Sequence, residues 1–142
     1  MLTLSIPDVK GFMTKLLKEN AFDGFMLRNA VINSFARFEI FGANTEECVM
    51  WGAVRQHVLG IVKGERPPKS IKIILGGNVE NTGIADATAL SVNIHFEDSK
   101  VNITTGISKK NFSLDKSDGK KWDAHVLKFL DDNQIKYINN IQ

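Results

Sequence analysis

Hydrophobic residues recur along this chain with two spacings, which separate strands from helices. Where every second residue is apolar a half-buried strand is expected, and where apolar residues recur every third or fourth position a helix is expected. The alternation is sharpest over residues 90–97, and the helical spacing is clearest over residues 9–17. In chain order the spacings predict strand 2–6, a helix from Pro7, a hairpin of 25–32 with 35–41, helix 47–63, strand 70–75, strands 90–97 and 100–106, strand 108–114 and a helix from Asp118.

Residues at the ends of the first two helices support these boundaries. Pro7 suits the first position of a helix, where its missing N–H leaves no hydrogen bond unmade, and Asp8 suits the positive end of the helix dipole. Asn44 or Thr45 is expected to cap the second helix, which stops at Gly64.

The order of elements, β-α-β-β-α-β-β-β-β-α with short connections, predicts an α+β domain with a mostly antiparallel sheet. Two helices are expected to pack on one face of this sheet. The C-terminal helix, with Trp122, Val126, Phe129 and Leu130 on one stripe, is expected to cover another part. A length of 142 residues and a hydrophobic fraction of 43% suit a single domain, 1–142, with one continuous core.

Turns are expected at Asn33–Ser34, near Thr105–Gly106, and in the glycine-rich stretch "ILGGNVENTG" of residues 74–83. That stretch lacks the spacing of a phosphate-binding loop. The Walker spacing requires a Gly-Lys-Ser/Thr that is absent after Gly76 or Gly77, and the Gly-x-Gly-x-x-Gly fingerprint of dinucleotide-binding proteins is absent too. The stretch is therefore interpreted as a turn.

The histidines and the cysteine form no pattern typical of a metal site or a nucleophile. His57 is expected to lie partly buried on the apolar side of the second helix, and His95 on the polar face of its strand. Zinc ligands usually come in closely spaced pairs, which these residues do not form. Cys48 stands beside Glu46 and Glu47, whose negative charges disfavour the reactive thiolate. We expect no metal, no cofactor and no enzymatic activity.

One alternative stays open, because residues far apart in sequence can converge in a fold. In this alternative the protein binds a small molecule, or acts on one as an enzyme, with His57, His95 or Asp86 in a cleft.

Charge and hydropathy predict a cytoplasmic protein without a membrane segment. The formal net charge is +2, which gives only weak attraction to nucleic acid. No apolar run approaches the roughly 20 residues that span a bilayer, and the N-terminus lacks the features of a signal peptide. With a single cysteine, no disulfide within the chain is possible.

Nearly the full length of the chain resembles a family of small uncharacterised bacterial proteins. The likeness rests on "LTLSIPDVKGFMTKLL", "IVKGERPPKSIKIIL", "TTGISKKNFSLDKS" and "KKWDAHVLKFL". This resemblance implies no activity.

Residues 1–115 also resemble, in pattern, one domain of a DNA sliding clamp, with residues 116–142 as an added C-terminal helix and tail. "LTLSIPDVKGFMTKLL" is similar to the opening strand and helix of such a domain, "MLRNAVINSFARFEIFG" to its hairpin, and "VNITTGISKKNFSLDK" to its closing strands. A clamp ring contains six such domains, two or three per chain, whereas this chain has one.

The clamp resemblance implies that helices face DNA. Cations are expected on the outward faces of the first two helices, at Lys10, Lys15, Lys18, Arg55 and Lys63. A single clamp-like domain also leaves sheet edges open, and open edges pair with other strands. We therefore expect a non-catalytic domain that binds a second copy of itself or another protein, with nucleic-acid binding through the five cations as the alternative.

Overall fold

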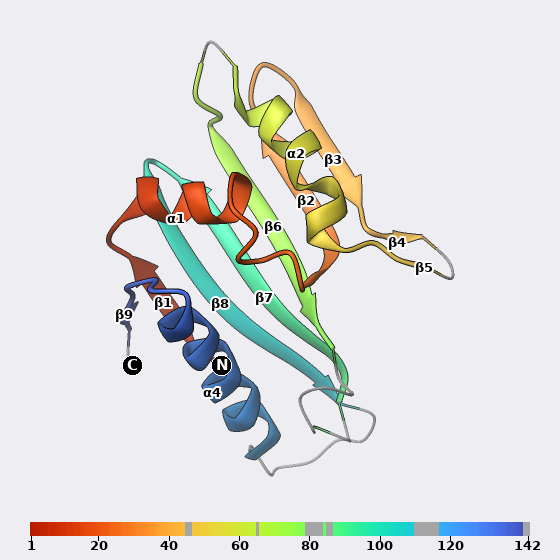
Figure 1. Cartoon of the computed structure of the whole chain (residues 1–142), viewed down its shortest axis with the longest axis vertical. Coiled ribbons are helices and arrows are strands. Elements are labelled where there is room, and N and C mark those ends of the chain that lie inside the picture. The colour runs from red at the N-terminus through yellow and green to blue at the C-terminus, as the bar shows by residue number, and fades with distance from the viewer. Residues whose placement is uncertain (45–46, 65, 79–83, 85–86, 110–116, 141–142) are drawn as a thin grey trace.

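The computed structural model of the chain is built around one antiparallel sheet (Figure 1). The structure describes residues 1–142 except 45–46, 65, 79–83, 85–86, 110–116 and 141–142. The described helices are α1 (Val9–Leu17), α2 (Trp51–Val62) and α4 (Ser117–Asp132). The described strands are β1 (Thr3–Ile6), β2 (Met26–Asn33), β3 (Arg37–Phe41), β4 (Ala43–Asn44), β5 (Glu47–Cys48), β6 (Ser70–Gly77), β7 (Ala87–Glu97), β8 (Lys100–Lys109) and β9 (Ile138–Asn139).

Seven of these strands form the main sheet in the order β3-β2-β6-β7-β8-β1-β9, and β4 pairs with β5 in a separate small hairpin. Every pairing in the main sheet is antiparallel. The predicted α+β class with an antiparallel sheet is confirmed.

The two faces of the main sheet differ in chemistry because side chains alternate along each strand. One row of paired residues crosses five strands as Ala30, Ile73, Ile94, Ile103 and Leu4, and every member is buried. This apolar face, here called the inner face, lies under the helices (Figure 1).

A neighbouring row on the opposite side, the outer face, is polar. It runs through Lys72, His95, Asn102 and Ser5, of which the first three are exposed. The sheet therefore has one face packed on a core and one face in contact with solvent, as antiparallel sheets commonly do.

Ring contacts and one indole hydrogen bond join the helices into a single layer over the inner face. The Trp51 indole N–H at the start of α2 donates to the Leu16 carbonyl of α1 over 2.9 Å. Phe22, after α1, packs edge-on against Phe12 of α1 and Phe129 of α4, with ring centroids 5.6 and 5.1 Å apart. The core lies between this layer and the sheet.

The second helix starts later than predicted. α2 begins at Trp51 with Met50 as its N-cap, not at residue 47, and Asn44 lies in β4 instead of capping a helix. Thr45, the other expected cap, lies outside the described residues. The cause is a tertiary contact: the Leu27 N–H donates to the Val49 carbonyl over 2.8 Å, which keeps the chain extended up to the helix.

The first helix and the first hairpin also differ slightly from expectation. Asp8 is the N-cap of α1, and its carboxylate accepts from the Gly11 N–H over 3.0 Å, so the helix begins after Pro7. The β2–β3 turn comprises residues 34–36, because Asn33 already pairs with Arg37.

The turn predicted at Thr105–Gly106 is wrong, since β8 runs unbroken to Lys109. Gly106 pairs with Ser91, and a Cβ at Gly106 would lie 2.6 Å from the Ser91 Oγ. This glycine makes room for a neighbouring side chain within a strand. The strand predicted over 108–114 begins inside β8, and residues 110–116 lie outside the described residues.

Candidate functional site

The longer open edge of the main sheet is β3, which pairs on one side with β2. The Gly42 N–H donates to the Arg28 carbonyl, and the Ser34 N–H donates to the Ala36 carbonyl, each over 3.0 Å. Hydrogen-bonded pairs recur at every second residue of an antiparallel ladder. The even-numbered residues of β3 therefore bond to β2. The backbone N–H and C=O groups of Arg37, Glu39 and Phe41 point to the open edge.

The side chains of β3 divide between the two faces of the sheet. Phe38 and Ile40 are half-buried and pack against the core from the inner face. Arg37, Glu39 and Phe41 lie on the outer face, where the Phe41 side chain is 68% exposed. The Arg37 guanidinium and Glu39 carboxylate are 4.0 Å apart. This edge thus carries two opposite charges and an exposed ring beside backbone groups that pair with none of the described strands other than β2.

The other edge of the sheet is β9, which is only two residues long. It pairs with β1 through Ser5–Ile138 and Leu4–Asn139. The Asn140 N–H donates to the Thr3 carbonyl over 2.9 Å, just beyond the strand. A strand this short offers little backbone for pairing, which is one way in which proteins protect a sheet edge.

The five cations predicted to contact nucleic acid occupy different environments. Lys10 of α1, Lys18 at the C-cap of α1 and Lys63 after α2 are exposed. Lys15 is half-buried and lines a cleft of about 200 Å³ between α1 and residues 134–136.

The fifth of these cations, Arg55, forms a two-pronged ion pair with Asp23. Its Nε and Nη2 donate to the two carboxylate oxygens over 2.8 and 3.1 Å. The hydrogen bond that Arg55 donates to Asp23 raises the pKa of Arg55 above its ordinary value. Arg55 thereby connects α2 to the segment after α1. The Asp23 carboxylate already accepts two of the parallel hydrogen bonds that the guanidinium could donate to a phosphate.

The histidines proposed for a cleft do not converge. His57 is exposed on α2, which corrects the expectation that it is partly buried. His95 lies on the outer face, 3.3 Å from the Glu97 carboxylate, whereas α2 covers the inner face. Asp86 lies outside the described residues. Within the described part of the chain, no group of three His, Cys, Asp or Glu side chains could hold a metal ion.

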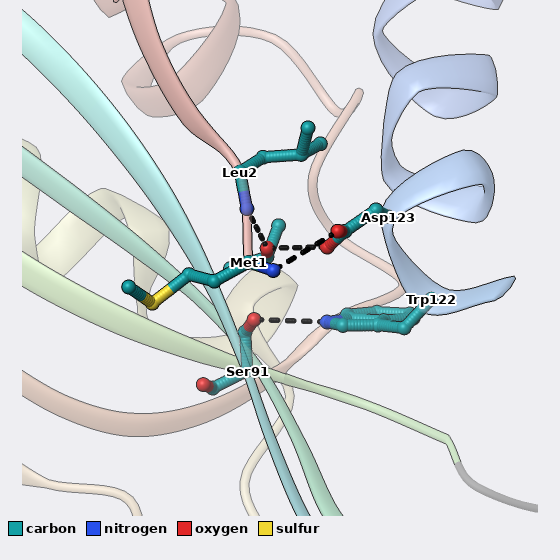
Figure 2. A network of polar contacts seen from close by, with 6 residues as sticks. Met1, Leu2, Ser91, Trp122 and Asp123 are labelled. Carbon is teal, nitrogen blue, oxygen red and sulfur yellow. Dashed lines mark hydrogen bonds and ion pairs between the residues drawn. The ribbon is translucent and has the colours of Figure 1, made fainter. Parts of the chain in front are cut away.

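A polar network fixes α4 to the sheet (Figure 2). Thr105, a threonine buried in the core, accepts from the Leu2 N–H over 2.8 Å and donates to the Asp123 carboxylate over 2.5 Å. The Met1 ammonium lies 3.3 Å from the same carboxylate. This network was not predicted from the sequence. The available signal is that Thr105 continues the alternation of the inward-facing Val101 and Ile103, which places a polar side chain in the core.

The indole of Trp122 makes a second contact that holds α4 against the sheet. Its N–H donates to the Ser91 carbonyl over 3.0 Å. A Cβ at Gly77 would lie 2.5 Å from the ring, so this glycine admits the indole. Gly76 and Gly77 belong to β6 and do not form the predicted turn, while residues 79–83 lie outside the described part. Beside the indole is an apolar cavity of about 220 Å³, whose lining includes Phe25, His125 and Phe129.

The model of a family of unknown function, DUF5721, matches residues 15–138. The chain belongs to this family. The predicted membership in an uncharacterised family is thereby confirmed, and DUF5721 membership assigns no activity. No curated protein and no solved structure matches the chain. The resemblance to a sliding clamp is therefore not confirmed. Among the helices that the structure describes, none is long and apolar enough to cross a membrane.

Proposed function

We propose that this DUF5721 protein is a self-association domain that pairs β3 with β3 of a second copy. The observation that carries this proposal is the open edge of β3, whose outward backbone groups bond to no described strand and whose side chains carry opposite charges. An exposed edge strand is a template for pairing with another chain. Two copies would continue one antiparallel sheet across a two-fold axis.

The charges on β3 select one register. If the two-fold axis passes through Phe38, Arg37 lies opposite Glu39 of the partner subunit, and Glu39 lies opposite the partner subunit's Arg37. Each pair joins residues whose backbone groups point to the open edge, so each can exchange both hydrogen bonds. An axis through Glu39 would instead place two carboxylates face to face, and like charges directly opposite are destabilising.

The same register also places aromatic surface at the junction. Phe38, half-buried on the inner face, meets Phe38 of the partner subunit and continues the core across the axis. An aromatic pair facing across two strands contributes about 0.2–1 kcal/mol. Phe41 lies near the far end of the paired segment, where the partner strand reduces its 68% exposure.

Sedimentation and light scattering over a range of concentrations test this proposal. Wild-type protein is expected to be a dimer that dissociates on dilution. Arg37→Glu and Glu39→Arg should each weaken the dimer, because each places like charges opposite one another. The double variant Arg37→Glu/Glu39→Arg should restore the dimer. Lys100→Glu, at the first residue of β8 and four strands away from β3, is the control for a change of charge.

Hydrogen exchange gives a second measurement with residue resolution. The amides of Arg37, Glu39 and Phe41 should become slower to exchange as concentration rises, whereas those of Phe38 and Ile40 should be protected at every concentration. A wild-type monomer at high concentration, or a double variant as weak as the single ones, would refute this pairing.

A further inference from the structure

A groove opens at the end of the sheet, beyond the tip of the β2–β3 hairpin. It has a volume of about 570 Å³ and lies between the hairpin tip and the segment that joins α2 to β6. Its described lining residues are Ser34, Phe35, Gly64, Arg66, Pro67 and Lys69. This volume is within the range of about 300–1,000 Å³ that is typical of sites for small ligands.

The two walls of the groove are tied together by hydrogen bonds. The Lys69 N–H donates to the Asn33 carbonyl over 2.7 Å. The Asn33 side-chain amide donates to the Ser70 hydroxyl over 2.9 Å. Pro67 and Pro68 further restrict the backbone of the loop wall. The groove is therefore present before any ligand binds.

One wall presents an aromatic ring. The Phe35 side chain is 87% exposed at the hairpin tip. Its ring contacts Phe38 edge-on, with centroids 5.5 Å apart and an angle of 75° between the ring planes. This contact orients the ring, and the 87% exposure of the side chain leaves a ring face open to a flat group. Exposed aromatic faces of this kind are the surfaces on which nucleic-acid bases stack.

The other wall supplies positive charge. Arg66 and Lys69 are both exposed and line the groove opposite the ring. No described residue of the lining is acidic. Arginine binds phosphate through two parallel hydrogen bonds, and lysine binds it as a point charge.

We propose that this groove binds a nucleotide unit, with the base stacked on Phe35 and the phosphate held by Arg66 and Lys69. The proposal does not rest on the β3 pairing, because Phe35, Arg66 and Lys69 line the groove within a single chain. Its residues are also distinct from the lysines of α1. The nucleotide is supplied either free or as part of a single strand, and the two sources share this chemistry.

Fluorescence anisotropy of a labelled single-stranded oligonucleotide, measured over a salt series, tests the proposal. Unlabelled nucleoside monophosphate serves as competitor and separates the two sources. Competition by the monophosphate supports a site that accepts free nucleotides as well as a strand. Strand binding without such competition supports a site that requires a strand. Affinity should fall with rising salt, because phosphate contacts release counterions.

Variants at the groove identify the contacts. Phe35→Ala should weaken binding about 5- to 150-fold, the range expected for loss of one base stack. Arg66→Glu/Lys69→Glu should weaken binding and make its salt dependence shallower. Ile138→Ala and Lys121→Glu are the controls, since they remove an exposed apolar side chain of β9 and an exposed charge of α4, both outside the groove lining.

All of these side chains are exposed, so circular dichroism and thermal unfolding should show folded variants. Two results would overturn the proposal. One is wild-type protein that binds neither the strand nor the monophosphate at low salt. The other is a Phe35→Ala variant that binds as well as Ile138→Ala.

Discussion

Replacement of Thr105 by valine tests how α4 is fixed to the sheet. The hydroxyl is buried, accepts from the Leu2 N–H and donates to the Asp123 carboxylate. Valine keeps the branched shape, so the change removes these two hydrogen bonds with little change in packing. A hydrogen bond to a charged group contributes about 1.5–3 kcal/mol, and the Leu2 N–H loses its acceptor as well. We expect Thr105→Val to lower the free energy of unfolding by about 2–4 kcal/mol.

Urea unfolding followed by tryptophan fluorescence measures this loss, and the melting temperature should fall by about 5–15 °C. The neighbouring Thr104→Val is the matched control. Thr104 lies on the outer face, where its hydroxyl accepts from the Asn93 amide over 3.2 Å, so its loss should cost under about 1 kcal/mol. If Thr105→Val cost no more than Thr104→Val, the network of Figure 2 would not hold α4 in place.

Two further predictions concern α4 and the segment after it. Gly77→Ala should lower the free energy of unfolding by about 1–3 kcal/mol and change the near-ultraviolet circular dichroism of Trp122. Gly24→Ala is the control and should change neither, because a Cβ at Gly24 would have no atom within 4 Å. Equal effects of the two variants would contradict the packing of Trp122 on Gly77. Tyr137 should ionise above its ordinary value of 10.0, because burial and then the Asp131 charge raise its pKa. Folding stability should consequently fall as pH rises above about 10, since the folded state retains the proton longer. Ultraviolet titration measures the pKa of Tyr137, the single tyrosine of the chain. Asp131→Asn should lower this pKa toward its ordinary value. An unchanged titration in that variant would contradict the role of Asp131.

The strands and helices that the sequence predicted well are those whose spacing is set by one buried face. Residues 90–97 alternate because every second side chain of β7 enters the core, as Ile94 does. Residues 9–17 keep the helical spacing because α1 buries one stripe, including Phe12 and Leu16. Such patterns are local, so one sequence is enough to find them.

The boundaries that failed depend on partners distant in sequence. The extended chain before Trp51 is held by Leu27, and no neighbouring residue signals that contact. Gly106 could equally turn the chain or make room for Ser91, and only the strand pairing decides between these roles. The sequence predicts His57 on the buried side of α2. The residues that α2 buries are Trp51 and Val58, and His57 lies on the exposed side.

The candidate surfaces were less predictable than the fold. Aromatic residues in a strand-forming stretch usually enter a core, so nothing in the sequence distinguished Phe35 and Phe41 as exposed. Phe41 is exposed on β3 at the edge of the sheet, which is a property of strand order, and Phe35 is exposed because it lies in the turn before β3. Arg55 was expected to face solvent because Asp23, its partner, lies 32 residues away.

The β3 pairing and the nucleotide groove, both proposed above, together make one quantitative prediction. With the two-fold axis at Phe38, Phe35 of one copy lies opposite Phe41 of the partner subunit. The two Phe35 side chains are then six residues apart along the strands, or roughly 20 Å at about 3.3 Å per residue. A single strand of several nucleotides can span this distance and occupy both grooves of the dimer. An oligonucleotide of that length should therefore bind the dimer more tightly than a short oligonucleotide that occupies one groove. Arg37→Glu, which is expected to weaken the dimer, should abolish this gain with length but leave binding of a short oligonucleotide within about twofold of wild type. A gain with length that survives in the monomeric variant would show that the two grooves do not act together across this axis.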